Sequence, residues 1–292
     1  MNKSLALLAL LVLLPVTPVS AEPASPALRF SATVVQQSPA ELNDGGEFAV
    51  TRSRLQNGGN LLASRRLIAN WDLEIGMTHY DFDSSADERW DDIYQVGVNL
   101  SLIHPLNRHW SLLLIPGVSA TGETDADVEK SLSYGMVAAL NWRAMDGLRL
   151  GVGGALYQNL DELQGFPVLM IDWQLTPRWR LANPLRSGVT GPAGLELSWQ
   201  AAKNWTLGTG STWRSLRFRL DAKGTSPGGV GEEDAVPVWL RLTRQFARTQ
   251  LTLYAGATLD GSLSSEDRHE HEVSHSDYDE TPFLALYFSG GF

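Results

Sequence analysis

Histidine and acidic residues gather in one segment near the C-terminus, where their chemistry would suit a metal ion. His269, His271 and His275 form a His-x-His-x-x-x-His run between Ser262 and Glu280. Imidazole nitrogens bind zinc and copper, and carboxylates bind harder divalent cations. The run lacks the fixed spacing of a dedicated site and lies among serine and acidic residues. We therefore predict no cofactor and no metal site, with these histidines as the candidates if a site exists.

A second group has the residue types of a hydrolase. His79 lies close in sequence to Asp81 and Asp83, and a histidine beside a carboxylate can act as a general base for a nucleophile. No serine stands near them in a recognisable nucleophile motif. The chain has no cysteine, which excludes a thiolate nucleophile, thiolate metal ligands and disulfides. We predict that the protein is not an enzyme.

The third group is a set of charged residues at alternating positions of apolar segments. Charges at every second position of an extended segment point to one side of it, so segments around a common interior would bring them together. In a confined interior such charges must be paired or hydrated, because an isolated buried charge is costly. They would either brace the wall as ion pairs or select charged solutes. The set comprises Asp72, Glu74, Arg143, Arg149, Asp172, Arg178, Arg180, Glu196 and Arg241.

The segments that carry these charges have the pattern of β-strands. From about residue 28 onward apolar and polar residues alternate, as in 71–78, 94–102 and 251–259. A soluble sandwich gives the same alternation, but here short connections alternate with longer ones, which is typical of outer-membrane barrels. The predicted tight turns lie at 65–70, 104–109, 143–147, 176–178, 200–204 and 245–249, and the predicted acidic external loops include 81–92, 123–129, 232–234 and 262–280.

Tryptophan lies close to the tight turns and on the apolar side of the alternation. An indole ring prefers the interface between lipid tails and water, because its body is apolar and its N–H is polar. A sandwich core gives no reason for tryptophans to share one depth. The predicted periplasmic girdle consists of Trp71, Trp110, Trp142, Trp173, Trp179, Trp199 and Trp205.

The N-terminal residues have the three zones of a secretory signal peptide. Lys3 is followed by an apolar run over 5–14 and by Val19-Ser20-Ala21. The run is shorter than the roughly 18 apolar residues that span a bilayer as a helix. We predict a signal peptide over 1–21 and an outer-membrane barrel over 22–292. The formal net charge of −10 argues against nucleic acid as a partner, because phosphate binding needs a basic face.

The C-terminal tail places Leu284, Leu286, Phe288 and the last residue, Phe292, on one parity. This tail resembles the terminal β-signal of Gram-negative outer-membrane barrels, which the barrel-assembly machinery reads. Gly290 departs from the usual apolar third-last position of that signal. Most of the mature chain is also similar to an outer-membrane β-barrel family of unknown function. The similarity extends from Phe-Ala-Val-Thr at 48–51, through Tyr-Asp-Phe at 80–82, to the tail. The resemblance implies fold and location and carries no activity or site residues.

These observations predict an all-β, antiparallel, up-and-down transmembrane barrel of about 14 strands, with about 12 as the alternative. The function we favour is a passive channel or small-solute conduit in the outer membrane. One alternative is a structural or surface-interaction barrel whose acidic external loops bridge divalent cations to lipopolysaccharide, and the other is an outer-membrane hydrolase. The predicted strands are 28–36, 47–58, 69–80, 92–103, 109–120, 131–143, 147–157, 166–175, 178–184, 193–200, 204–219, 235–246, 249–259 and 281–292.

Overall fold

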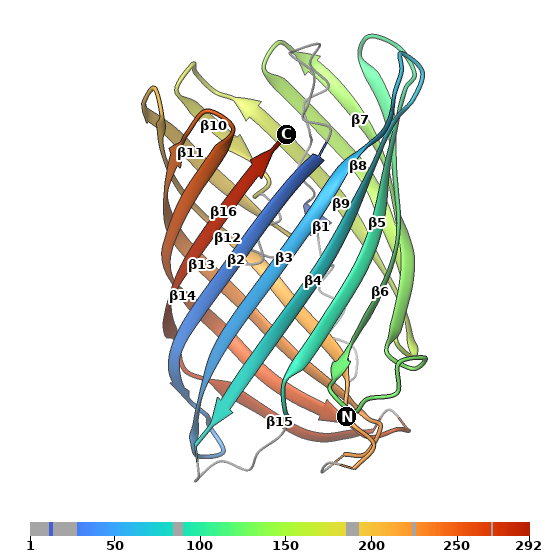
Figure 1. Ribbon diagram of the computed structural model, residues 1–292, viewed down its shortest axis with the longest axis vertical. Coiled ribbons are helices and arrows are strands. Elements are labelled where there is room, and N and C mark those ends of the chain that lie inside the picture. Colours follow the sequence, from blue (N-terminus) through green and yellow to red (C-terminus); the bar gives the residue numbers. More distant parts are fainter. Residues whose placement is uncertain (1–11, 14–27, 84–89, 185–192, 224–225, 270) are drawn as a thin grey trace.

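A closed antiparallel β-barrel makes up most of the chain (Figure 1). Fourteen strands pair around the wall in sequence order, with β16 beside β2 and β8 beside β9 completing the ring. The predicted fold class and the count of 14 strands are therefore confirmed. No helix of the described chain is long and apolar enough to cross a membrane. The computed structural model describes residues 12–13, 28–83, 90–184, 193–223, 226–269 and 271–292.

The wall strands begin near the predicted positions, and several continue beyond the predicted loop ends because they go on pairing with their neighbours. β13 starts five residues earlier than predicted, so Glu232, Glu233 and Asp234 lie in a strand and not in an acidic loop. The wall consists of β2 (Leu28–Glu41), β3 (Glu47–Ala63), β4 (Ile68–Phe82), β5 (Ile93–Pro105), β6 (Trp110–Glu123), β7 (Leu132–Met145), β8 (Leu148–Asn159), β9 (Glu162–Gln174), β10 (Trp179–Ala182), β11 (Ala193–Ala202), β12 (Trp205–Arg219), β13 (Val230–Gln245), β14 (Thr249–Glu266) and β16 (Thr281–Gly291).

Two further short strands are not part of the barrel wall. β15 (Glu272–Tyr278) pairs with the far end of β14, inside the segment predicted as the last external loop, so that part of the loop prediction is wrong. β1 (Val12–Leu13) pairs in parallel with Val168 and Leu169 of β9. The remaining residues of the predicted signal peptide lie outside the described residues.

The four-residue strand β10 is continued by the side chain of Asn183. Its Oδ1 accepts a hydrogen bond from the backbone N–H of Ile171 at 2.8 Å, and its Nδ2 donates to the carbonyl of Gly194 at 3.1 Å. The side chain of Asn183 is buried. A single amide therefore links β9 to β11 beyond the point where β10 stops pairing, because it satisfies backbone groups that a longer strand would satisfy.

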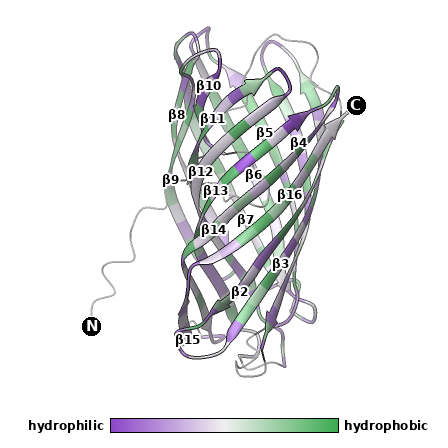
Figure 2. Cartoon of the chain, turned by 90° about the vertical axis from the view of Figure 1, so that its left-hand side faces the viewer, coloured by the Kyte–Doolittle hydropathy of each residue, from purple (hydrophilic) through white to green (hydrophobic). Residues whose placement is uncertain are grey.

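The alternation gives the wall two different faces, and Figure 2 shows hydrophobic and hydrophilic residues following one another along the strands. Large apolar side chains such as Leu55, Ile75 and Val96 are exposed on the outside. The inner face mixes polar side chains with buried apolar ones, and one inner cluster over β5 to β9 includes Val137 and Val168. The sequence predicts a small or polar inner face, so this apolar inner wall is an addition that the alternation alone does not predict.

The two ends of the barrel differ in their connections. At one end, hairpin turns join the strands, and the start of β2 meets the last residue of the chain there, because Leu28 and Phe292 exchange backbone hydrogen bonds at 3.0 and 3.5 Å. Phe292 also stacks on Phe30, with ring centroids 5.7 Å apart. The outer face of β16 carries the exposed side chains of Leu284 and Leu286. We call this the turn end and the opposite one the loop end.

Candidate functional site

Three adjoining cavities occupy the turn end of the barrel interior. Their volumes are about 350, 390 and 370 Å³. The first shares Arg29 and Asp72 with the second, and it shares Arg143 and Arg149 with the third. We call the three cavities together the vestibule. Each is large enough for a small organic molecule.

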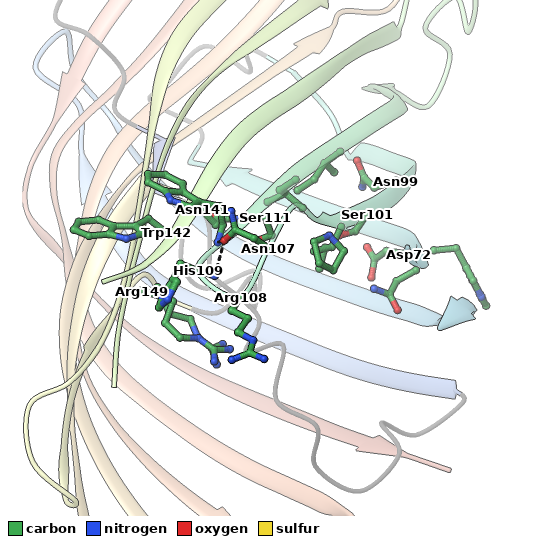
Figure 3. A pocket seen from close by; sticks show the side chains of 18 of the residues that line it. Asp72, Asn99, Ser101, Asn107, Arg108, His109, Ser111, Asn141, Trp142 and Arg149 are labelled. Atoms are coloured by element: carbon green, nitrogen blue, oxygen red, sulfur yellow. Dashed lines mark hydrogen bonds between the residues drawn. The ribbon is translucent and has the colours of Figure 1, made fainter. Parts of the chain in front are cut away.

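Polar side chains from neighbouring strands line the first cavity. Asn99 and Ser101 come from β5, Ser111 from β6 and Asn141 from β7, and His109 comes from the turn before β6. Figure 3 shows these side chains around one space. Amides and hydroxyls both donate and accept hydrogen bonds, so this lining suits a polar solute. Apolar lining residues from the inner cluster complete the wall: Ile103, Leu113 and Ile115.

The vestibule lining carries more arginine than aspartate, although the whole chain has a formal net charge of −10. The arginines come from strands and turns all around the barrel, so the excess is not confined to one hairpin. A confined cavity lined by one sign of charge concentrates counter-ions. The positively charged lining residues are Arg29, Arg108, Arg143, Arg149, Arg180 and Arg248, and the negatively charged ones are Asp72, Asp146 and Asp172.

The arginines lie closest together on β7, β8 and β10. Arg143 and Arg149 are direct cross-strand partners, and Arg149 is in turn the partner of Asp172 on β9. Arg180 Nε donates to Asp172 Oδ1 at 2.6 Å. The Nη1 atom of Arg149 is buried and has no hydrogen-bond partner among the described residues. We call Arg143, Arg149 and Arg180 the arginine cluster.

The other predicted lumen charges lie in separate groups. Arg241 pairs with Glu196 at 2.5 Å, and both side chains are largely buried. Glu74 accepts from Gln56 at 2.7 Å and lies 3.4 Å from Arg54. Arg178 is exposed in the turn before β10 and lies on none of the three cavities. The structure therefore divides the predicted set into local pairs and the vestibule charges.

The predicted tryptophan girdle lies at the turn end. Trp110 and Trp142 stack with ring centroids 5.8 Å apart, and Trp179 and Trp199 stack at 5.9 Å. The guanidinium of Arg244 lies 4.8 Å from the ring centre of Trp205. The other two members, Trp71 and Trp173, occupy strand ends beside the same turns. Each stacked pair joins two adjacent strands, so these rings gather near the turns.

A buried carboxylate that the sequence analysis missed organises the loop end. Glu233 is fully buried. Arg52 Nη2 donates to Oε1 at 2.6 Å and to Oε2 at 2.5 Å, and Arg214 Nη2 donates to Oε1 at 2.7 Å. The hydroxyls of Tyr80 and Tyr278 donate to Oε2 at 2.5 Å and Oε1 at 3.1 Å. Hydrogen bonds between charged groups of this kind are among the strongest in proteins.

Aromatic and aliphatic side chains pack against this carboxylate at the loop end. Tyr278 meets Phe48 edge to face at 5.0 Å, and Trp90 meets Phe218 in the same manner at 5.1 Å. We call Glu233, its four donors and these packed side chains the loop-end plug. The buried members of the packed cluster are Ala40, Leu42, Phe48, Val50, Tyr80, Trp90, Ile93, Phe218, Leu220, Leu263 and Tyr278.

Backbone pairing across the barrel adds to this closure. Arg219, at the end of β12, forms a parallel bridge with Gly122, at the end of β6. Glu123 accepts hydrogen bonds from the backbone N–H of Asp221 at 2.5 Å and of Asp91 at 2.7 Å. Since β6 and β12 are far apart around the wall, this bridge joins opposite sides of the barrel. The loop end is closed by backbone contacts as well as by side chains.

The histidine candidates do not form a metal centre among the residues described. The rings of His269 and His271 lie 6.5 Å apart, whereas His275 lies on β15 against Asp277. No group of three or more possible ligands is placed to hold an ion in the described part of the chain. Asp267 instead accepts hydrogen bonds from the backbone N–H groups of His271 and His269, and these bonds lower the pKa of its carboxyl.

The candidate hydrolase residues form a different contact from the one predicted. His79 Nδ1 lies 2.6 Å from Asp92 Oδ1, and both side chains are exposed to solvent to a large extent. Asp92 immediately precedes β5, whereas the sequence analysis paired His79 with Asp81 and Asp83. Within the described residues, no serine hydroxyl is hydrogen-bonded to His79. This pair stabilises the contact between neighbouring strands.

Several solved structures resemble this barrel. An outer membrane channel from Pseudomonas putida F1 is 14% identical, with 95% of this chain and 100% of that chain covered and a TM-score of 0.48. The toluene transporter TodX from Pseudomonas putida is 8% identical, with 92% and 90% covered and a TM-score of 0.45. A FadL homologue from Pseudomonas aeruginosa is 10% identical, with 91% and 89% covered and a TM-score of 0.44.

The comparison with protein families covers most of the barrel. No curated protein matches the chain. The family described as a domain of unknown function, DUF6268, matches residues 64–281. This range begins at the first hairpin turn after β3 and reaches the first residue of β16. The protein belongs to the DUF6268 family.

Proposed function

We propose that this protein is an outer-membrane barrel that conducts small polar solutes, with its turn end facing the periplasm. The vestibule carries this proposal, because it places hydrogen-bonding and charged side chains inside the barrel along the route of a solute. The exposed apolar outer face and the stacked tryptophans support a position in a bilayer. Short turns on the periplasmic side are usual for such barrels.

The loop-end plug makes this a conduit whose external mouth is closed in the conformation described. A solute entering from outside would have to pass the packed rings around Phe48 and Trp90 and the bridge between β6 and β12. Conduction therefore requires those contacts to rearrange. The interior thus has cavities at one end and packed side chains at the other, which is the arrangement of a pathway at rest.

Conductance of the refolded mature protein in a planar bilayer tests the proposal. We expect discrete current steps that are absent from bilayers treated with detergent alone. A variant with Phe48→Ala and Trp90→Ala should open more often, because it removes two rings of the plug. A barrel that is correctly folded by heat-modified gel migration and silent in both forms would contradict conduction.

A structural barrel is the second candidate, and the closed loop end is the observation that favours it. The external surface is also acidic around Asp91, Asp125 and Asp127, and such groups could bridge divalent cations to lipopolysaccharide. In that case removal of divalent cations should lower retention of the protein in outer-membrane fractions. Recovery of the mature chain from soluble periplasm would contradict both candidates.

Assembly by the barrel-assembly machinery is part of the same proposal. The parity of Leu284, Leu286 and Phe288 on β16, together with the terminal Phe292, supports it. Deletion of Phe292 should lower the amount of folded barrel in cells while leaving refolding in detergent possible. Equal amounts of folded protein in cells would argue against recognition of this tail.

A further inference from the structure

We propose that the arginine cluster of the vestibule is a binding site for a small polar solute that carries an oxyanion, a carboxylate or a phosphate group. This inference rests on the conduit function proposed above and names its substrate class. The site consists of Arg143 on β7, Arg149 on β8 and Arg180 on β10, and it lies where the first and third cavities meet. Guanidinium groups match the planar, two-oxygen geometry of such anions.

The strand register brings like charges together with too few carboxylates beside them. Arg143 and Arg149 are directly opposite each other on adjacent strands, so two like charges lie side by side. Asp172 is the cross-strand partner of Arg149, and it accepts from Arg180 at 2.6 Å. Asp146 also lines the third cavity, so two carboxylates face three guanidinium groups there, which leaves a net positive site.

Arg149 has unused hydrogen-bonding capacity at this site. Its Nη1 is buried and lacks a hydrogen-bond partner among the described residues. A buried donor without a partner is unfavourable, and native proteins usually satisfy such donors with a protein group, water or a ligand. Arg149 lines both the first and the third cavity. An oxyanion at their junction would supply both the missing acceptor and the missing negative charge.

The rest of the vestibule suits the uncharged part of a small solute. Asn141 and Ser111 line the first cavity beside Arg143 and Arg149, and Figure 3 shows Asn141, Ser111 and Arg149 around the same space. Amide and hydroxyl groups would bind hydroxyl or carbonyl groups of the solute. Cavities of about 350 and 370 Å³ accommodate a molecule of the size of a short dicarboxylic acid or a sugar phosphate.

Basic residues near a membrane surface also attract lipid headgroups, which carry the same phosphate chemistry. Arg178 represents that situation, because it is exposed in a turn and lines none of the three cavities. The arginine cluster differs from it because its members line the barrel interior. Arg178→Ala is therefore a matched control that removes a nearby arginine and leaves the vestibule intact.

Isothermal titration of the refolded mature protein in non-ionic micelles tests the site with two probes, succinate and inorganic phosphate. We expect saturable binding of at least one probe that weakens as sodium chloride is added, because salt screens the attraction. Arg149→Ala should weaken binding by about tenfold or more, Arg149→Lys should restore part of it, and Arg178→Ala should leave it unchanged. Heat-modified gel migration verifies that each variant is folded.

Binding of neither probe by the folded wild-type protein would overturn the inference, as would equal binding by wild type and Arg149→Ala. Micelles doped with phosphatidylglycerol provide the lipid arm. Binding of that lipid alone, without saturable binding of either probe, would also overturn the solute site. Binding of the probes does not require an open pore. A barrel that binds a probe and conducts no current would contradict only the proposed conduit function. A barrel that conducts current and binds neither probe would contradict only this site.

Discussion

The loop end and the turn end of the barrel interior hold their charges in different surroundings. At the loop end, Glu233 is fully buried and accepts hydrogen bonds from two arginines and two tyrosines. At the turn end, Arg149 has a buried nitrogen without a hydrogen-bond partner among the described residues, beside a cavity of about 370 Å³. The first arrangement balances its arginines with a buried carboxylate, although Arg52 Nε and Arg214 Nε also lack hydrogen-bond partners among the described residues. The second has more arginines than carboxylates beside a cavity, which leaves positive charge for water or a solute.

The difference shows how one wall can combine stability with binding. A buried carboxylate that accepts hydrogen bonds from several β-strands holds those strands together. Loss of one charged group leaves its partners buried without a counter-charge, which is strongly destabilising. Hydrated charges in a cavity contribute little to stability because solvent replaces a lost partner. Stability should therefore depend on the loop-end plug, and solute selectivity should depend on the vestibule.

Replacement of Glu233 should have the largest effect on stability. Glu233→Gln removes the negative charge that Arg52 and Arg214 share while keeping the side-chain volume. We expect a loss of about 3–5 kcal/mol in the free energy of unfolding, because two largely buried guanidinium groups lose their counter-charge. Urea unfolding of the refolded barrel, followed by tryptophan fluorescence, measures the loss.

The neighbouring Glu232→Gln is the matched control for that variant. Glu232 is partly exposed, and its partner Arg217 also contacts Glu266 at 2.7 Å. The expected loss is below about 1 kcal/mol, because Arg217 keeps Glu266 as a counter-charge and Glu232 is partly exposed to solvent. Equal losses for the two variants would remove the special role given to Glu233.

An intermediate effect is expected at the pair formed by Arg241 and Glu196. Both side chains are about nine-tenths buried, and two guanidinium nitrogens donate to the carboxylate. Arg241→Ala should cost about 2 kcal/mol in unfolding free energy, since Glu196 would then keep, among the described residues, the indole N–H of Trp239 at 3.3 Å as its one side-chain donor. Arg244→Ala on the same strand should cost about 0.5 kcal/mol, because it removes a cation–π contact with Trp205 at an exposed site. The reverse order of the two losses would contradict this ranking.

Truncation in the vestibule should change selectivity with little change in stability. Arg143 is solvent-exposed and lines two of the three cavities. We expect Arg143→Ala to alter unfolding free energy by less than about 0.5 kcal/mol and to shift the reversal potential under a salt gradient toward lower anion preference. A stability loss as large as that of Glu233→Gln, without a shift in reversal potential, would place Arg143 in a structural network and remove the contrast between the two ends.

The smallest effect concerns the turn that contains Asp267, outside the wall. The pKa of its carboxyl is lowered by hydrogen bonds from the backbone N–H groups of His271 and His269. Because the folded pKa lies below the unfolded one, the stabilisation is present above the unfolded pKa and is lost as pH falls through the folded pKa. NMR titration should give a pKa below the ordinary aspartate value of 3.8. An Asp267 that titrates at or above that value would show that these bonds do not form in solution.

The hairpin-level features of the candidate site could be predicted from the sequence. Asp172 and Arg180 flank one turn, and a short turn brings such residues onto adjacent strands, where they pair at 2.6 Å. The stacked pair Trp110 and Trp142 follows from the same alternation, since both rings lie on the outward parity near turns. The ion pair between Arg241 and Glu196 could not be predicted from the sequence, because those residues lie on strands that are not consecutive in the chain.

The sequence by itself determined the wall strands, the alternation of inward and outward residues and the tight turns, because these depend on a two-residue period and on short connections. Only the tertiary structure decided which inward charges meet. Arg52 and Glu233 are 181 residues apart in the chain, and Glu233 stands among acidic neighbours typical of an exposed loop. Their contact exists because the closed barrel brings the loop ends of β3, β4, β12 and β13 over one interior, a proximity that no local pattern encodes.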